Sequence, residues 1–335
     1  MGGKKKDGGA PKKAAKKDQD AGESTALLFR KYKKNCERLS APISHKLVEK
    51  LSECVTEGGD LTEVHLWEEL RWSGVRALME ALDEEQYQHV KSLRLWKTEA
   101  EDEGVRAVAQ FLKTNKSVRI LEFLDCKVTP LGCEFLGRVL APSVGTAVTV
   151  LKLDHNEIGS EGAVQLAKGL SMNPTLVSLS LSYCGITAEG AEALFEMIIF
   201  QRSSLKELNL QGNHLRNEGA KEVFWGLRVA KVLEKVNLSD NQFGRDDELM
   251  GLVKTCMEKN KVLGTYDLRF NGINDADAMK IVDVLPECPH VHDVMLGERL
   301  SEPVYTALQE ALKANKPRRG KKKGKGGKKK KKGKK

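Results

Sequence analysis

Aromatic residues are scarce in this sequence, and long apolar runs are missing. Only 5% of the 335 residues are aromatic, while 40% are hydrophobic, so we expect a core built mainly from leucine and alanine. No apolar run approaches the roughly 18 residues that a membrane-spanning helix needs. No apolar segment of a secretory signal follows the basic N-terminus. We therefore expect neither a membrane span nor a secretory leader.

The cysteines show no pairing pattern. There are seven of them, an odd and scattered set without any CxxC spacing. This distribution indicates free thiols in a reducing compartment. We therefore expect a cytoplasmic protein, with the nucleus as an alternative.

The sequence also lacks residues arranged for catalysis or for holding a metal or cofactor. The segment 288–293, "CPHVHD", groups possible ligands, but zinc needs four ligands that converge on one point. His155 and His214 have no nucleophile at a usable spacing, and no Ser or Thr follows a GK pair as a phosphate loop requires. The sequence therefore predicts a protein that is not an enzyme and has no metal or cofactor.

Basic charge is missing from the body of the chain, although the whole chain carries +9. From Arg318 to Lys335, 13 of 18 positions are Lys or Arg and the rest are Gly, and residues 1–20 hold 7 Lys against 3 Asp. Residues 21–317 then hold 36 basic against 44 acidic side chains, a balance of −8. A segment of Lys and Gly buries no apolar surface to offset its ordering entropy. Both ends are expected to be disordered until they meet a polyanion.

The body of the chain contains an internal repeat of 28 to 30 residues. The pattern LxxLxLxxN/CxL is clear in "VTVLKLDHNEI" from Val148, "LVSLSLSYCGI" from Leu176, "LKELNLQGNHL" from Leu205, "LEKVNLSDNQF" from Leu233 and "LGTYDLRFNGI" from Leu263. Weaker copies start at Leu61, Val90, Val118 and Val291. Chance clustering of apolar residues would not keep this interval, so we predict nine repeats.

Each repeat predicts a short strand, a turn and a helix. The apolar first, fourth and sixth places would point into the core of a pleated strand, and segments such as "EGAVQLAKGL" have helical apolar spacing. A small polar side chain at the ninth place is expected to bond the backbone of the turn and of the neighbouring repeat. These ladder residues are Cys126, Asn156, Cys184, Asn213, Asn241 and Asn271. The two cysteines are thereby assigned to structure and not to redox chemistry.

This pattern, with a full helix per repeat, resembles the ribonuclease-inhibitor-like class of leucine-rich repeat proteins. The resemblance covers roughly residues 61–313. It implies an α/β solenoid, a horseshoe with a parallel sheet on the concave face and helices on the convex face. It implies little about function, because the class includes inhibitors, a GTPase activator, immune sensors and cytoskeletal proteins. A GTPase-activating or inhibitor-type role is a minor alternative.

Caps are expected at both ends of the array. Residues 1–22 and 316–335 are assigned to Lys-rich tails, residues 23–60 to a helical cap, and residues 61–315 to the repeats with a C-terminal capping helix. The residues of the N-terminal cap expected to face inward are Leu27, Leu28, Leu47, Val48 and Leu51. The last repeat, "VHDVMLGERL", lacks a ladder residue, as a terminal repeat can.

The seventh place of each repeat is predicted to point into the hollow of the horseshoe. In the first three repeats this place holds Trp67, Trp96 and Leu124, where the fold needs no apolar side chain, and Arg94 and Lys97 lie beside them. Adjacent tryptophans on a rigid sheet are typical of a protein-binding site, where one aromatic contributes about 2 kcal/mol or more. The alternative is that the N-terminal helices fold over these residues as part of the cap. Charges elsewhere in the hollow are mixed in sign, unlike those of a nucleic-acid groove.

The C-terminal tail is predicted to bind a polyanion with strong salt dependence. The residues assigned to this contact are Arg318, Arg319, Lys321, Lys322, Lys323, Lys328, Lys329, Lys330, Lys331 and Lys332. Lysines on a flexible glycine-rich chain offer point charges without fixed geometry, so they are not expected to recognise a specific sequence. The candidates are acidic tubulin tails, RNA or an anionic membrane surface. A nuclear-localisation signal and a purely solubilising tail are alternatives.

The segments "LTEVHLWEEL" and "VKSLRLWKTEAEDEGV" resemble the opening repeats of leucine-rich repeat proteins of ciliary and flagellar axonemes. This resemblance covers two repeats and implies a place on a microtubule lattice. The leading hypothesis is a non-enzymatic axonemal scaffold whose concave face binds other proteins and whose tails bind tubulin. The second hypothesis is a nuclear or nucleolar adaptor whose tails bind RNA and whose array binds a regulator.

Overall fold

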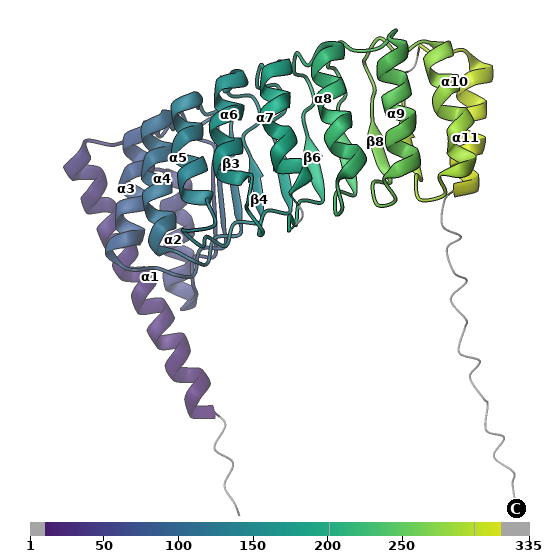
Figure 1. Cartoon of the computed structure of the whole chain (residues 1–335). Helices are drawn as coiled ribbons and strands as arrows, with labels where there is room; N and C mark the ends of the chain where they lie inside the picture. The colour runs from purple at the N-terminus through teal and green to yellow at the C-terminus, as the bar shows by residue number, and fades with distance from the viewer. Residues whose placement is uncertain (1–10, 201, 298, 316–335) are drawn as a thin grey trace, which may run out of the picture.

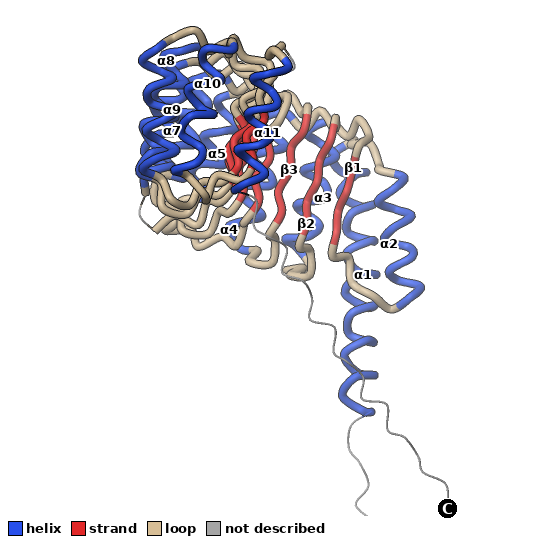
Figure 2. Tube along the Cα trace, turned by 90° about the vertical axis from the view of Figure 1, so that its right-hand side faces the viewer, coloured by secondary structure: helices blue, strands red, loops and turns tan. Residues whose placement is uncertain are grey.

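The chain folds into a curved stack of strand–helix repeats, in a computed structural model that describes residues 11–200, 202–297 and 299–315. Within these residues nine parallel strands form one sheet in chain order. Figure 2 shows the strands side by side along the inner face, and Figure 1 shows the helices in a row along the outer face. The predicted horseshoe, with its sheet inside and its helices outside, is confirmed.

The elements alternate along the chain. The strands are β1 (Glu63–Leu66), β2 (Ser92–Trp96), β3 (Ile120–Leu124), β4 (Val150–Lys152), β5 (Ser178–Ser180), β6 (Glu207–Asn209), β7 (Lys235–Asn237), β8 (Thr265–Asp267) and β9 (Asp293–Met295). The helices are α1 (Pro11–Leu39), α2 (His45–Glu57), α3 (Arg71–Glu84), α4 (Glu101–Thr114), α5 (Pro130–Leu140), α6 (Gly159–Leu170), α7 (Ala188–Ile199), α8 (Arg216–Val229), α9 (Asp247–Lys259), α10 (Asp275–Val284), the short 3-10 helix η1 (Leu285–Glu287) and α11 (Glu302–Asn315).

The register between neighbouring strands follows the repeat without a slip. The fourth places form one row across the sheet: Val64, Leu93, Leu121, Leu151, Leu179, Leu208, Val236, Tyr266 and Val294. All these side chains are buried beneath the helices. Because side chains alternate between the two faces of a strand, the third and fifth places point to the concave face.

The curvature follows from the different widths of strands and helices. Neighbouring strands lie about 4.8 Å apart and packed helices about 8–10 Å apart, so the helices occupy the longer outer arc. Glycines let neighbouring helices on this outer arc pack closely against each other. A Cβ atom at Gly169 of α6 would lie 1.9 Å from the carbonyl oxygen of Gly137 in α5, so a larger residue would push the two helices apart.

The ninth-place residues are hydrogen-bonded at the turns that follow the strands. Asn213 Nδ2 donates to the carbonyl oxygens of Leu181, in the preceding repeat, and of Leu210, each at 2.9 Å. Its Oδ1 accepts from the amide nitrogen of Cys184 at 3.1 Å. The Cys184 thiol in turn donates to Leu153 O at 3.3 Å, and burial raises its pKa to about 12, so it stays protonated. Corresponding bonds recur at Cys126, Asn156 and Asn271; Asn241 donates through Nδ2 in the same way, but its buried Oδ1 accepts no hydrogen bond from the described residues.

A second ladder, which the repeat pattern did not indicate, lies at the loops that precede the strands. Asn173 Nδ2 donates to Leu140 O of the preceding repeat at 2.6 Å, while Asn173 Oδ1 accepts from Leu176 N at 2.9 Å. Asn115 and Asn260 make matching bonds. Each of these asparagines stands three positions before a repeat start. Side-chain amides therefore link neighbouring repeats at both edges of the sheet.

The N-terminal cap consists of α1 and α2. Of the residues predicted to face inward, Leu28, Leu47 and Leu51 are buried and Val48 packs half-buried against the core. The prediction for Leu27 is wrong, because this side chain is 40% exposed. Helix α1 turns Leu28, Tyr32 and Cys36 inward at a spacing of four residues, which leaves Leu27 on the flank of the buried stripe.

Helix α1 begins at Pro11, so the predicted boundary between tail and cap lies inside this helix. Its second half runs antiparallel to α3. Lys31 Nζ lies 2.8 Å from the carboxylate of Glu85, just after α3, while Arg38 pairs with Glu80 further back in that helix. The start of α1 consequently lies beyond the edge of the array where α3 ends, as Figure 1 shows.

Helix α11 closes the other end of the array. Its buried face consists of Val304, Leu308 and Leu312. Asn315 Nδ2 donates to three carbonyl oxygens of the segment between α10 and β9, at distances of 2.9 to 3.0 Å. This amide repeats the bonding of the second ladder and fixes the end of α11 against the last loop.

We expect Asn213→Ala to lower the free energy of unfolding by about 3 kcal/mol, because it leaves several buried backbone groups without a partner. Urea unfolding followed by circular dichroism measures the change. Glu218→Ala, at an exposed position nearby on α8, serves as the control and is expected to shift stability by about 0.5 kcal/mol or less. Equal effects of the two substitutions would contradict a stabilising ladder.

Candidate functional site: one end of the concave face

The concave face gathers apolar side chains at its N-terminal end. Trp67, Trp96 and Leu124 come from the seventh place of their repeats, and Ile120 and Val150 come from the third. We call these five residues the N-terminal patch. Trp67 is 50% exposed and the other four are half-buried, so the patch faces the hollow. The three apolar residues singled out in the sequence thus lie on neighbouring strands.

The imidazole of His65 lies between the two indoles. Its ring centroid is 4.7 Å from that of Trp67 and 4.3 Å from that of Trp96, with interplanar angles of 74° and 73°. Edge-to-face pairs of this kind contribute about 0.5–1.5 kcal/mol beyond their buried area. Burial, together with the nearby cations Arg94 and Lys46, keeps the pKa of His65 below its ordinary value, so the ring is neutral at pH 7.

A buried carboxylate fixes the second indole. Glu122 is 3% exposed, and its Oε2 accepts a hydrogen bond from Trp96 Nε1 at 3.0 Å. Its Oε1 lies 3.1 Å from Lys152 Nζ and 3.7 Å from Arg94 Nε. A buried charge needs such partners, because its desolvation is otherwise costly. The predicted site residue Arg94 therefore acts within the face, holding Glu122 beneath the patch.

The N-terminal cap reaches the patch without covering Trp67. Lys46 of α2 places its Nζ 3.1 Å from the ring centroid of Trp67, a cation–π contact. Half of the Trp67 surface remains exposed, so α1 and α2 do not bury this side chain. Lys97, the other predicted cation, stands outside this group: its side chain is 78% exposed and lies 4.0 Å from Asp125.

Five contributors to the site were not assigned to it in the sequence: His65, Glu122, Ile120, Val150 and Lys46. His65 occupies a fifth place, two residues before Trp67, so the period of the strand could have assigned it to the site, while Glu122 was expected only as one of the mixed charges that face the hollow. Ile120 could have been found by the same argument. Lys46 had no such signal, because it belongs to a helix outside the repeats.

The remaining concave face is polar. Ser180, Asn209 and Asn237 form the middle of the fifth-place row, which ends near the paired Asp267 and Arg269, 2.6 Å apart. The mixed charges expected from the sequence are therefore accompanied by a run of neutral hydrogen-bonding groups.

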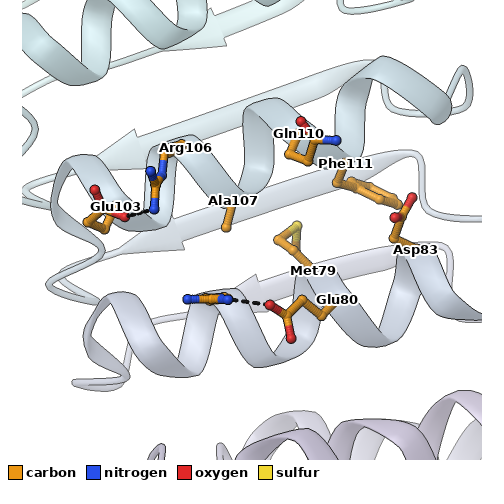
Figure 3. A pocket seen from close by; sticks show the side chains of 9 residues that line it. Met79, Glu80, Asp83, Glu103, Arg106, Ala107, Gln110 and Phe111 are labelled. Atoms are coloured by element: carbon orange, nitrogen blue, oxygen red, sulfur yellow. Dashed lines mark hydrogen bonds and ion pairs between the residues drawn. The ribbon is translucent and has the colours of Figure 1, made fainter. Parts of the chain in front are cut away.

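A groove of about 340 Å³ lies between α3 and α4 on the convex face, and Figure 3 shows side chains that line it. Met79 and Phe111 lie between the helices, and Arg76 Nε lies 2.7 Å from Glu80. Burial alone would raise the pKa of the Glu80 carboxyl, but hydrogen bonds from Arg76 and Arg38 outweigh it and leave the pKa below its usual range. With its central charges paired, we assign this groove no catalytic role.

Two of the histidines considered in the sequence, His155 and His292, have structural partners. His292 Nδ1 lies 3.0 Å from the carbonyl oxygen of His290, and the buried Cys288 thiol donates to Met257 O at 3.2 Å. The His155 ring stacks on Tyr183 with centroids 4.7 Å apart. In the described part of the chain, no three or more His, Cys, Asp or Glu side chains are grouped as metal ligands. None of the helices described there combines the length and apolarity needed to span a bilayer.

The predicted polyanion-binding residues lie outside the described residues. All ten, from Arg318 to Lys332, belong to the segment 316–335. Their contact with a polyanion stays a prediction.

Comparisons with known proteins agree with the fold. A family described as "Leucine Rich repeat" matches residues 146–167, 173–195 and 202–224. The chain is also 34% identical over 133 residues to ribonuclease inhibitor from Mus musculus, an alignment that covers 39% of this chain and 28% of that protein. The chain therefore contains leucine-rich repeats similar to those of ribonuclease inhibitor. A third match, to NACHT, LRR and PYD domains-containing protein 5 from Homo sapiens, is 28% identical over 213 residues and covers 62% of this chain and 17% of that one.

These similarities concern the repeats. The leucine-rich repeat chain spans 17% and 28% of the lengths of the two relatives, so their whole-protein activities do not transfer to it. Among solved structures, it overlaps with the tropomodulin C-terminal domain from Caenorhabditis elegans, with a TM-score of 0.38 and 12% identity over 47% of this chain and 92% of that one. An overlap this low has no bearing on function.

We expect Lys46→Gln to raise the pKa of His65 in this leucine-rich repeat protein, because removing a nearby cation stabilises the protonated imidazole. A pH titration of the histidine side chains by NMR measures the shift. Lys50→Gln, one turn further along α2, is the control and is expected to leave His65 unchanged. A His65 pKa that is the same in wild type and Lys46→Gln would contradict the placement of Lys46 over the patch.

Proposed function

We propose that the protein is a non-enzymatic scaffold that captures another protein at the N-terminal patch of its concave face. The exposed Trp67, held next to Trp96 on a rigid sheet, is the observation that carries this proposal. Large aromatic side chains dominate the binding energy of most protein interfaces. The fold needs no apolar residue at these places. Displaying the two tryptophans therefore costs the array none of its own stability.

The patch is arranged before any partner arrives. The His65 ring contacts both indoles, Lys46 lies on the face of Trp67, and Glu122 holds the indole nitrogen of Trp96. Side chains already fixed in one rotamer lose little entropy on binding, so more of the contact energy appears as affinity. The partner best suited to this surface has an apolar anchor for the patch and polar groups for the serine and asparagine row beyond it.

The Lys-rich ends are the second part of the proposal. We propose that they hold the scaffold on an acidic polymer, and we take the acidic tails of tubulin in a ciliary or flagellar axoneme as that polymer. The resemblance of the opening repeats to axonemal leucine-rich repeat proteins supports this choice, and the 13 basic residues among positions 318–335 supply the charge. Attraction between exposed charges is screened within about 8 Å at physiological ionic strength, so this attachment is salt-sensitive.

We expect Trp67→Ala to weaken capture of the partner by about 30-fold, and the double change with Trp96→Ala to abolish it, because one buried aromatic is worth about 2 kcal/mol. Affinity capture from ciliated cells, quantified by mass spectrometry, compares each variant with wild type. Trp72→Ala and Trp225→Ala are matched controls, since these tryptophans are 37% and 41% exposed on helices. Unchanged capture by the double variant would dispose of the proposed site.

We expect a tail-neutral variant, in which the ten basic residues assigned to polyanion binding become Gln, to lose salt-sensitive co-sedimentation with microtubules. Proteolytic removal of tubulin's acidic tails should cause the same loss for the wild-type protein. Circular dichroism checks that the array stays folded. Retardation of RNA by the wild-type protein, without any pelleting on microtubules, would favour the nuclear adaptor instead.

A further inference from the structure

The folded array has a basic edge of its own. We call the loop edge the six loops that precede β3–β8, as far as the structure describes them: residues 115–119, 141–149, 171–177, 200, 202–206, 230–234 and 260–264. Their sequences contain six basic residues, Lys116, Arg119, Arg202, Lys206, Lys231 and Lys261, against one acidic residue, Glu234. In the same repeats, the turns at the opposite edge contain five acidic residues against three basic ones. The charge of the array is therefore segregated between its two edges.

All six cations of the loop edge are exposed. Lys116 Nζ donates to Val144 O at 2.9 Å, which holds its charge at this edge, and Lys206 pairs with Glu234 at 2.7 Å. Arg202, Lys231 and Lys261 have no carboxylate partner in the part of the chain that the structure describes. Their charges are therefore available to a ligand.

Both Lys-rich ends join the body at the two ends of this edge. Thr25 of α1 is buried, and its hydroxyl lies 3.0 Å from Gly59 O, to which it donates, and 3.1 Å from Tyr87 Oη. These partners belong to the loops before β1 and β2. Asn315 is bonded to the segment before β9, as described above. Figures 1 and 2 both place the start of α1 and the end of α11 on this side of the array.

We propose that the loop edge binds an acidic polypeptide segment, so that the array itself contributes to the tethering proposed for the basic ends, on which this inference rests. Four of the six cations are lysines, whereas phosphate recognition favours the planar fork of arginine. The edge also exposes Met172 and Val262, at 63% and 42%, and the adjoining end of α8 exposes Val229, at 46%; these apolar side chains suit a polypeptide better than a phosphate backbone. Six strands about 4.8 Å apart span roughly 24 Å, the length of about seven residues of extended chain.

The arrangement makes attachment multivalent. A segment held by one Lys-rich end stays close to the loop edge, which raises its effective concentration there without any new contact. The concave face lies on a different side of the molecule, so a protein in the hollow and an acidic segment on the edge do not compete for the same surface.

The experiment uses the full-length chain and a fluorescent poly-L-glutamate of about 20 residues, followed by anisotropy over a range of salt. An edge-neutral variant, Arg202→Gln with Lys231→Gln and Lys261→Gln, is expected to bind on the order of tenfold more weakly, with a shallower salt dependence. The matched control removes the same charge from the opposite edge, by Lys97→Gln with Arg216→Gln and Arg245→Gln. This control is expected to bind within about twofold of wild type, and circular dichroism verifies the fold of both.

The possible outcomes separate this inference from the proposed tethering. If the tail-neutral variant loses all binding while the edge-neutral variant binds like wild type, the loop edge is overturned and the tethering stands. If the wild-type protein binds no poly-L-glutamate, both binding by the loop edge and tethering by the Lys-rich ends are contradicted. If the edge-neutral variant and its control lose the same affinity for poly-L-glutamate, the effect reflects net charge alone, and specific binding by the loop edge is contradicted. Tighter binding to a 20-base-pair RNA duplex, or to phosphatidylserine vesicles, than to poly-L-glutamate would overturn the assignment to a polypeptide.

Discussion

The side-chain amide at the ninth place of the repeat is the interaction on which the structure depends. Each turn buries backbone groups that water cannot reach, and Asn213 and its counterparts satisfy them in their own repeat and in the one before. This bond joins consecutive repeats at a fixed spacing. With strands narrower than helices, a fixed spacing produces a constant curvature, and the curvature creates the hollow. The hollow that we propose as the binding surface is therefore a geometric consequence of these hydrogen bonds.

Three surfaces of the array differ in the side chains that they present. The concave face presents side chains that the core does not use, and at its N-terminal end these are Trp67 and Trp96, supported by the buried Glu122. The loop edge presents cations and lies next to the points where both Lys-rich ends join the body. The convex face is made of helices whose exposed charges are often paired, as Arg76 and Glu80 are. The surface proposed to bind a protein and the surface proposed to bind a polyanion are thus separated in space, which suits a scaffold that joins the two.

Features that recur with the repeat could be predicted from the sequence. Features that depend on how separate elements pack against each other could not. The ladder at Asn156 and Asn213, the strand register and the outward place of Trp67 all repeat every 28 to 30 residues, so each copy supports the others. The second ladder, at Asn115, Asn173 and Asn260, repeats less regularly and was overlooked. Lys46 lies outside the repeats, and its position over Trp67 depends on how α2 packs. The inward position predicted for Leu27 is wrong because the sequence of α1 does not show which flank of its apolar stripe packs against α3.

Hydroxyl-radical footprinting of the complex would show whether a partner is captured at the N-terminal patch. The method reports how fast each exposed side chain is oxidised, with and without the bound protein. We expect oxidation of Trp67 to fall several-fold in the complex, while oxidation of Trp225 on the convex face stays unchanged. An unchanged rate at Trp67, with protection elsewhere on the array, would contradict capture at the N-terminal patch.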